Sequence, residues 1–387
     1  MKNLLSASFG LSVLASTTVS GASLTALTTF GGGDGWRAPN EIVTGDTAGT
    51  STGANYNYLG TGSLERGMSY NPATGNLVVV SRSASGNGIR ILNGTTGADA
   101  GALNQGSAVI AGGTFTTNMV AIGGDGATYV ANLVSPFTAA TPTNFRIYRW
   151  ANDAATPTVA YSGVPLPDGG RLGDSINVTG SGTSTQLVFG EGLGTGTTIF
   201  PGYAVFSTTD GSAFTGSRIT FTGTPSTNGD QRLGVTFLDS NTVMATDGGL
   251  WFVSDFAGGS GTVTDSSATT SASERALDYT EFTGSNGVNK LLATIDTASS
   301  LVRVYDMTDP NSPVLLTSAN ATAGVLTANG NGVGSVQWGA VSGDTATLYA
   351  MSSNQGIQAF TFTVPEPSVA MLGLAALGGL LGRRRRS

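Results

Sequence analysis

Residues 66–81 decide the fold, and they read Arg66-Gly67-Met68-Ser69-Tyr70-Asn71-Pro72-Ala73-Thr74-Gly75-Asn76-Leu77-Val78-Val79-Val80-Ser81. The centre of this run, from Asn71 to Asn76, is rich in the residues that form tight turns. The segment that follows, Leu77–Ser81, is short and mostly β-branched. A turn placed between two short segments of this kind predicts a pair of antiparallel strands.

Similar units recur along residues 24–363, where short β-branched or alternating segments are separated by Gly, Asn, Asp, Ser and Pro. This spacing predicts an all-β fold without a helical domain. Several units open on a related step, at Arg66-Gly67, Arg171-Leu172-Gly173, Arg232-Leu233-Gly234, Arg275-Ala276 and Val333-Gly334. The glycines in these steps are expected to lie where backbones approach closely.

The units resemble the four-stranded blades of a β-propeller, because they repeat at intervals of about 35–55 residues. There are about six of them, near 66–110, 114–163, 171–223, 231–264, 274–318 and 332–363. We expect Leu24–Phe30 to add a strand to the last blade and so fasten the ring. A two-sheet sandwich and a parallel solenoid remain alternatives.

Composition excludes several chemistries. The 387 residues include no Cys and no His, so disulfides, thiolate catalysis, His-based triads and the usual zinc sites are excluded. The net charge of −7 and the lack of a basic stripe argue against nucleic acid as a partner. No cofactor, metal site or catalytic residue is assigned. Calcium is the metal that such a chain would suit best, but no ligand series for it appears.

The N-terminus has the layout of a secretory signal peptide. Lys2 precedes an apolar segment from Leu4 to Ala15, and Ser20-Gly21-Ala22 offers small residues for cleavage. We therefore interpret residues 1–22 as a signal peptide and residues 23–363 as the exported body.

The C-terminus contains a second targeting pattern in residues 364–387. It begins with the motif Val364, Pro365, Glu366 and Pro367. An uncharged segment follows, which includes Val369, Leu372, Leu374, Leu377, Leu380 and Leu381. The chain then reaches Arg383, Arg384, Arg385 and Arg386. Residues 369–382 would cover about 21 Å as a single hydrophobic helix, and the arginines favour the cytoplasmic side.

This tail resembles a PEP-CTERM sorting signal, since the motif, the apolar segment and the arginine cluster occur in that order. The resemblance implies a Gram-negative host that makes extracellular polysaccharide. It also implies an exosortase-type membrane enzyme as a partner and processing near the Pro-Glu-Pro motif. The chain would be held at the inner membrane transiently and then reach the cell surface or matrix. An ordinary C-terminal membrane anchor is the alternative.

Several residues of the body have both a structural and a functional interpretation. Arg66, Arg171, Arg232 and Arg275 would either ring one end of a channel and bind an anion, or pair with nearby acids. Those acids are Glu65, Asp174, Asp230 and Glu274. The aromatic residues Trp36, Tyr56, Tyr58 and Trp338 would either stack on sugars or pack in the core.

The sequence thus predicts an exported, surface- or matrix-associated binding or structural protein without enzymatic activity. Extracellular polysaccharide is the partner class that fits this location. The alternative is an extracellular carbohydrate-active hydrolase that uses paired carboxylates. A surface-layer or adhesive component is a third interpretation.

Overall fold

The computed structural model of the chain describes residues 21–47, 58–82, 88–106, 108–137, 143–166, 170–192, 202–222 and 230–364. The turn at Asn71 forms as expected. Its side-chain Oδ1 accepts the Ala73 N–H at 3.0 Å, and its carbonyl accepts the Gly75 N–H at 2.8 Å. Gly75 has a φ of 74°, which a residue with a side chain adopts only at a cost. The turn joins β3 (Glu65–Tyr70) to β4 (Asn76–Ser81) in antiparallel register.

The all-β prediction is confirmed, and across the described residues the strands form six consecutive antiparallel groups. The first two groups are β3 and β4 with β5 (Ile89–Asn93) and β6 (Asp99–Ala102), then β7 (Phe115–Ile122), β8 (Thr128–Phe137), β9 (Phe145–Trp150) and β10 (Thr158–Gly163). The next two are β12 (Asn177–Thr179), β13 (Gln186–Gly192), β14 (Gly202–Thr208) and β15 (Phe214–Thr222), then β16 (Val235–Phe237), β17 (Thr242–Asp247), β18 (Leu250–Ala257) and β19 (Ser260–Ala268). The last two are β20 (Glu274–Gly284), β21 (Gly287–Asp296), β22 (Leu301–Asp306) and β23 (Val314–Ala319), then β24 (Gly334–Ser342), β25 (Thr345–Ser352), β26 (Ile357–Thr363) and the N-terminal β1 (Ser23–Ala26).

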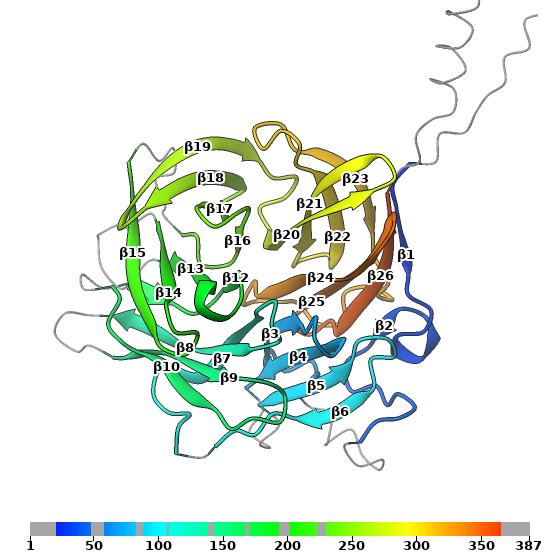
Figure 1. Cartoon of the computed structure of the whole chain (residues 1–387). Helices are drawn as coiled ribbons and strands as arrows, with labels where there is room; N and C mark the ends of the chain where they lie inside the picture. The colour runs from blue at the N-terminus through cyan, green and yellow to red at the C-terminus, as the bar shows by residue number, and fades with distance from the viewer. Residues whose placement is uncertain are drawn as a thin grey trace, which may run out of the picture.

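The groups are arranged around a common centre, and the first strand of each group lies innermost (Figure 1). These inner strands contact one another in a closed cycle, β3 with β7, β7 with β12, β12 with β16, β16 with β20, β20 with β24, and β24 with β3. Hydrogen bonding joins three neighbouring groups into one sheet of 13 strands. The links are the short β11 (Gly170–Leu172), which pairs with β8 and β13, and a parallel pairing of β15 with β19.

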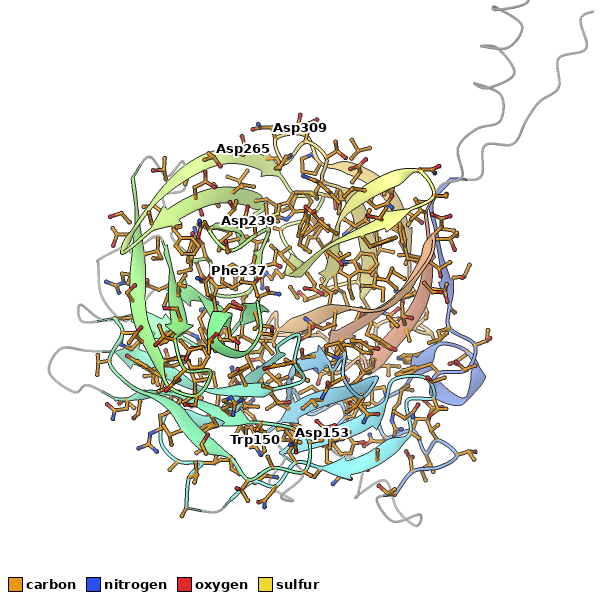
Figure 2. All side chains as sticks on the ribbon, in the orientation of Figure 1. Trp150, Asp153, Phe237, Asp239, Asp265 and Asp309 are labelled. Carbon is orange, nitrogen blue, oxygen red and sulfur yellow. The ribbon has the colours of Figure 1, made fainter. Side chains whose placement is uncertain are left out.

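Apolar side chains fill the space between adjacent groups. Val78 and Val80 of the first group pack with Val120 and Trp150 of the second, and Trp150 is fully buried. Polar contacts reinforce this boundary, because the Asn71 amide donates to Asp153 at 3.0 Å. Trp150 and Asp153 lie together at the edge of the ring in Figure 2. The burial of these apolar side chains supplies the main stabilising term.

Two of the expected glycines lie where the backbones of neighbouring groups approach closely. A Cβ on Gly67 would lie 2.8 Å from the backbone nitrogen of Val120. A Cβ on Gly173 would lie 2.2 Å from the carbonyl oxygen of Asn132, and its φ is +108°. No larger side chain fits at either contact without a shift of the backbone. The expectation of close backbone approach is therefore confirmed for Gly67 and Gly173.

The two ends of the described body lie side by side. β1 pairs with β26, with Ser23 opposite Thr363 and Leu24 opposite Phe362. The short β2 (Trp36–Arg37) also pairs with β26. The prediction that the N-terminal segment adds a strand to the last group is confirmed for Ser23–Ala26. Among the described residues, no helix is long and apolar enough to cross a membrane.

Candidate functional site

The main candidate site is a pocket of about 510 Å³ at the end of the ring where the inner strands begin. Its lining includes Arg66, Arg82, Arg171 and Arg232, together with Phe115 and Asn331. We call it the arginine pocket. Arg66 and Phe115 lie at this end because the inner strands β3 and β7 begin here. β4 runs antiparallel to β3 and therefore ends here, so Arg82, which directly follows β4, lies at the same end.

Strand irregularities occur at two of these arginines. The pairing of β3 with β4 shifts register between Glu65 and Gly67, so Arg66 is an extra residue with no partner across the ladder. The pairing of β11 with β8 shifts between Gly170 and Leu172, but there the extra residue lies on β8, opposite Arg171, and Arg171 itself pairs with Gly192 of β13. Bulges of this kind redirect a side chain and are common beside functional sites.

Two of the arginines pair with acids, as one of the two interpretations expected. Arg171 donates to Asp174 at 2.7 Å, and the Nε of Arg232 lies 3.4 Å from Oδ1 of Asp230. Hydrogen bonding to Asp174 raises the pKa of Arg171. The positive charges of Arg171 and Arg232 are thus compensated within the protein.

Arg66 behaves differently. Only 5% of this residue is exposed, its Nε is buried without a hydrogen bond, and no ion pair forms with any described acid. The neighbouring Glu65 carboxylate instead accepts the backbone N–H groups of Gly60 and Asn354. Burial lowers the pKa of Arg66 to about 10, repulsion from Arg82 and Arg171 adds to the effect, and attraction by Asp174 and Glu65 offsets part of it. The group remains protonated at neutral pH, so a buried positive charge faces the pocket.

Arg82 forms the second wall of the pocket. Its guanidinium lies 3.8 Å from the centroid of the Phe115 ring and donates one hydrogen bond to the Ser63 carbonyl at 3.0 Å. Its Nε is buried without a partner. The sequence analysis missed Arg82 and Phe115. Arg82 was detectable in principle, because the residue after the second strand of a hairpin returns to the edge where the first strand began.

The pocket has a closed floor. Two residues beyond Arg66 on β3, Met68 packs on the axis with Met119, Ile176 and Leu233. The remaining space on the axis has a volume of about 20 Å³, enough for about one water molecule. The ring therefore offers a pocket at this end, with the axis behind it filled by side chains.

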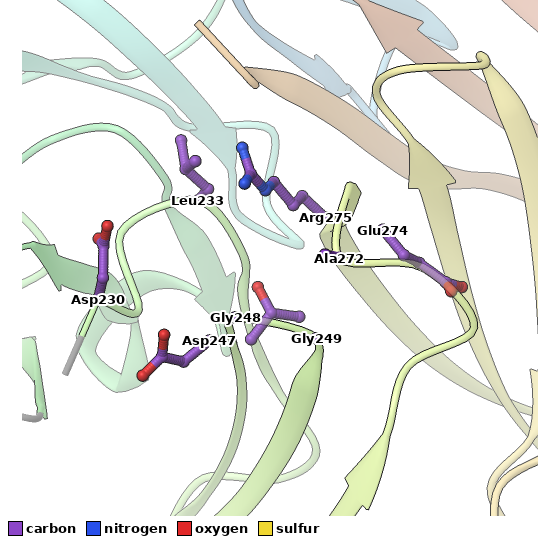
Figure 3. A pocket seen from close by; sticks show the side chains of 9 residues that line it. Asp230, Leu233, Asp247, Gly248, Gly249, Ala272, Glu274 and Arg275 are labelled. Carbon is purple, nitrogen blue, oxygen red and sulfur yellow. The ribbon is translucent and has the colours of Figure 1, made fainter. Parts of the chain in front are cut away.

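A second pocket of about 290 Å³ is lined by Asp230, Asp247, Glu274 and Arg275 among others (Figure 3). Burial raises the pKa of Asp230, and repulsion from Asp247 acts in the same direction. The Glu274 carboxylate points away from these two acids in Figure 3. It accepts hydrogen bonds from the hydroxyl groups of Thr270, Thr294 and Tyr305, and it pairs with Arg303 at 3.5 Å. The expected pairing of Glu274 with Arg275 does not form, and Glu274 has a structural role.

The aromatic candidates for sugar stacking lie in the core where they are described. Tyr58 is fully buried and donates to Asp99 at 2.8 Å. Trp36 and Trp338 are 9% and 8% exposed. Tyr56 lies outside the described residues. Within the described part of the chain, no group of three or more acidic side chains is arranged to hold a metal ion.

The predicted sorting motif can be followed only at its first residue. Val364 is 6% exposed, packs in the core of the last group, and donates its N–H to the Asp344 carbonyl at 2.9 Å. The other predicted residues of the tail, Pro365 to Pro367, the membrane segment and Arg383 to Arg386, lie outside the described residues, as does the signal peptide up to residue 20.

No protein-family model matches the chain, and no curated protein matches it. Among solved structures, a DUF4623 family protein from Bacteroides eggerthii is similar, with a TM-score of 0.58 and 14% identity over 79% of this chain and 72% of that chain. AofleA from Arthrobotrys oligospora has a TM-score of 0.46 and 11% identity, over 86% and 92% of the two chains. A 6-phosphogluconolactonase-like protein from Bacteroides fragilis has a TM-score of 0.42 and 12% identity, over 79% and 83%. The first of these similarities shows a shared fold, and none bears on activity.

Proposed function

We propose that the chain is an exported, non-enzymatic binding protein of the cell surface or matrix, and that its body is a six-bladed β-propeller. The cycle of contacts between the six inner strands supports this fold, as does the pairing of β1 with β26. In this view residues 1–22 direct export. A PEP-CTERM tail delivers the chain to an exosortase-type enzyme at the inner membrane.

The observation that carries the binding role is the arginine pocket, in which Arg66 is buried and forms no ion pair with a described residue, although Asp174 and Glu65 attract it from a longer distance. A buried charge without a close partner lowers the stability of the fold. Such a cost is typical of a site maintained for a ligand. The pocket volume of about 510 Å³ lies in the range of small-molecule sites.

One observation favours the alternative of a hydrolase. A carboxyl group with a raised pKa beside a second carboxylate is the usual arrangement of a general acid and its partner, and Asp230 and Asp247 share a pocket. However, the described residues that line this pocket include no aromatic side chain to hold a sugar ring. We therefore rank this function second.

A glycan array and a hydrolysis screen of the full chain, purified in mild detergent, separate the two functions. We expect retention of some glycans without release of products. Hydrolysis that disappears in Asp230→Asn and persists in Arg66→Met would establish the alternative. A chain that neither retains nor cleaves any glycan contradicts both.

A further inference from the structure

We propose that the arginine pocket binds one oxyanion group (carboxylate, sulfate or phosphate) of an extracellular ligand, with Arg66 as its charge partner at the floor and Arg82 at the rim. This inference rests on the proposed function, because the same pocket is the binding site. It adds the chemical class of the ligand and the residues that recognise it.

The charge balance of the pocket sets the charge of the ligand. Four guanidinium groups line it, and two of them are compensated by Asp174 and Asp230. Arg66 and Arg82 form no ion pair among the described residues, and the nearby Glu65 attracts both of them only from a longer distance. A group that carries a negative charge would supply the close partner that both arginines lack.

The donor geometry suits an oxyanion. A guanidinium group offers parallel N–H donors that match the oxygens of carboxylate, sulfate or phosphate. The Nε atoms of both Arg66 and Arg82 are buried and lack acceptors. The guanidinium of Arg82 is held against the Phe115 ring, so part of the entropy of ordering this side chain is already lost before binding.

The surroundings of the arginine pocket favour binding of a small anionic group over binding of a long acidic polymer. The whole chain has a net charge of −7, so a polyanion is repelled from most of the surface. The pocket gathers four arginines, and its floor is closed by Met68 and its neighbours. A single anionic group at the end or side of a sugar chain can enter, whereas the axis is too narrow for the chain to pass.

The test is a titration of the full chain at low ionic strength with glucuronate, inorganic sulfate and inorganic phosphate, and with glucose as the neutral control. Calorimetry gives the affinity, and the thermal midpoint gives an independent signal, because a ligand of the native state raises it. We expect at least one anion to bind and to weaken as salt is added, and glucose to have no effect. The anion that binds most tightly identifies the source, an acidic sugar or a sulfate or phosphate ester.

Arg66→Met is expected to weaken anion binding at least tenfold. Without anion, it should leave the thermal midpoint unchanged or raise it, since an uncompensated buried charge is replaced by an apolar side chain of similar length. Lys290→Gln is the matched control. It removes the same charge from an exposed pair with Glu281 outside the pocket, and it should change neither quantity.

Two outcomes overturn the inference. Either no anion binds at low ionic strength, or Arg66→Met binds anions as the parent does, whether or not its stability changes. If Arg66→Met does not fold, Arg82→Gln at the half-buried rim must weaken binding by a comparable factor. If neutral glycans bind and anions do not, the inference fails while the proposed binding function stands.

Discussion

Ser23, the first residue of the first strand, lies opposite Thr363, the last residue of the last strand. The last group of strands is therefore completed by two segments that are 340 positions apart in the chain. The predicted signal peptide ends at residue 22 and the predicted sorting tail begins at residue 364, so each adjoins one residue of this pair. β1 can pair only after β26 has been synthesised, because β1 has no other hydrogen-bonded partner among the described strands.

The closing strand should control the stability of the whole fold. Leu24 packs against the core of the last group, so Leu24→Asp would place an unpaired charge there. We expect a loss of about 2–3 kcal/mol in the free energy of unfolding, measured in urea. Thr25→Asp changes an exposed neighbour on the other face of the same strand and should cost less than about 0.5 kcal/mol. Equal effects of the two variants would show that β1 does not close the fold.

Close backbone contact, more than backbone conformation, should make Gly173 irreplaceable. Gly173 and Gly287 both have a φ of +108°, but a Cβ on Gly173 would lie 2.2 Å from the Asn132 carbonyl, whereas Gly287 has nothing within 4 Å. Gly287→Ala should cost about 1–2 kcal/mol through conformation alone. Gly173→Ala should cost at least about 3 kcal/mol in the same urea experiment. Similar losses for the two variants would contradict the contact.

Asp278 should make the protein less stable at high pH. Its carboxylate accepts the Trp338 N–H at 2.7 Å and the Asn177 amide at 3.2 Å, and burial raises its pKa to about 7. The unfolded value is lower, near 3.9. The native state therefore holds a proton that the unfolded state has lost between about pH 4 and pH 7, and stability falls as pH rises through this window.

The variant Asp278→Asn removes this titration. Each unit of pKa difference corresponds to about 1.4 kcal/mol, so the stability of the parent relative to the variant should fall by a few kcal/mol between pH 4 and pH 8. Urea unfolding at both pH values measures the effect. Parallel pH profiles for parent and variant would exclude Asp278 as the source.

The arginine cluster of the tail should determine retention at the membrane. Replacement of Arg383, Arg384, Arg385 and Arg386 by Gln removes the charge that opposes transfer across the inner membrane. In a Gram-negative host that lacks the processing enzyme, we expect the parent in the membrane fraction and the Gln variant partly in the periplasm. Replacement of all four by Lys preserves the charge and should preserve retention. A parent chain found in the cytosol would refute the predicted export.

The sequence alone determined the strands and their grouping. The turn at Asn71–Asn76, the β-branched segment after it and the repeats of both were enough, because strand formation depends on local turn chemistry and on the period of apolar residues. The placement of the N-terminal segment beside the last group also followed from the sequence, since an open edge strand needs a partner. Four of the six units were bounded to within a few residues of the observed groups. The first extended further, to residue 110 against Ala102, and the third began earlier, at residue 171 against Asn177.

Only the tertiary structure decided which arginine remains uncompensated. Arg171 reaches Asp174, but Arg66 cannot reach Glu65, although the two are adjacent in sequence. Neighbouring side chains of a strand point to opposite faces, and the bulge at Arg66 depends on the register with β4, which no local pattern encodes. The arrival of Arg82 and Phe115 in the same pocket depends on how two strand groups pack together. Local sequence specifies the strands and turns. Whether a charge is compensated depends on distances between side chains, and these are set only when the strand groups pack together.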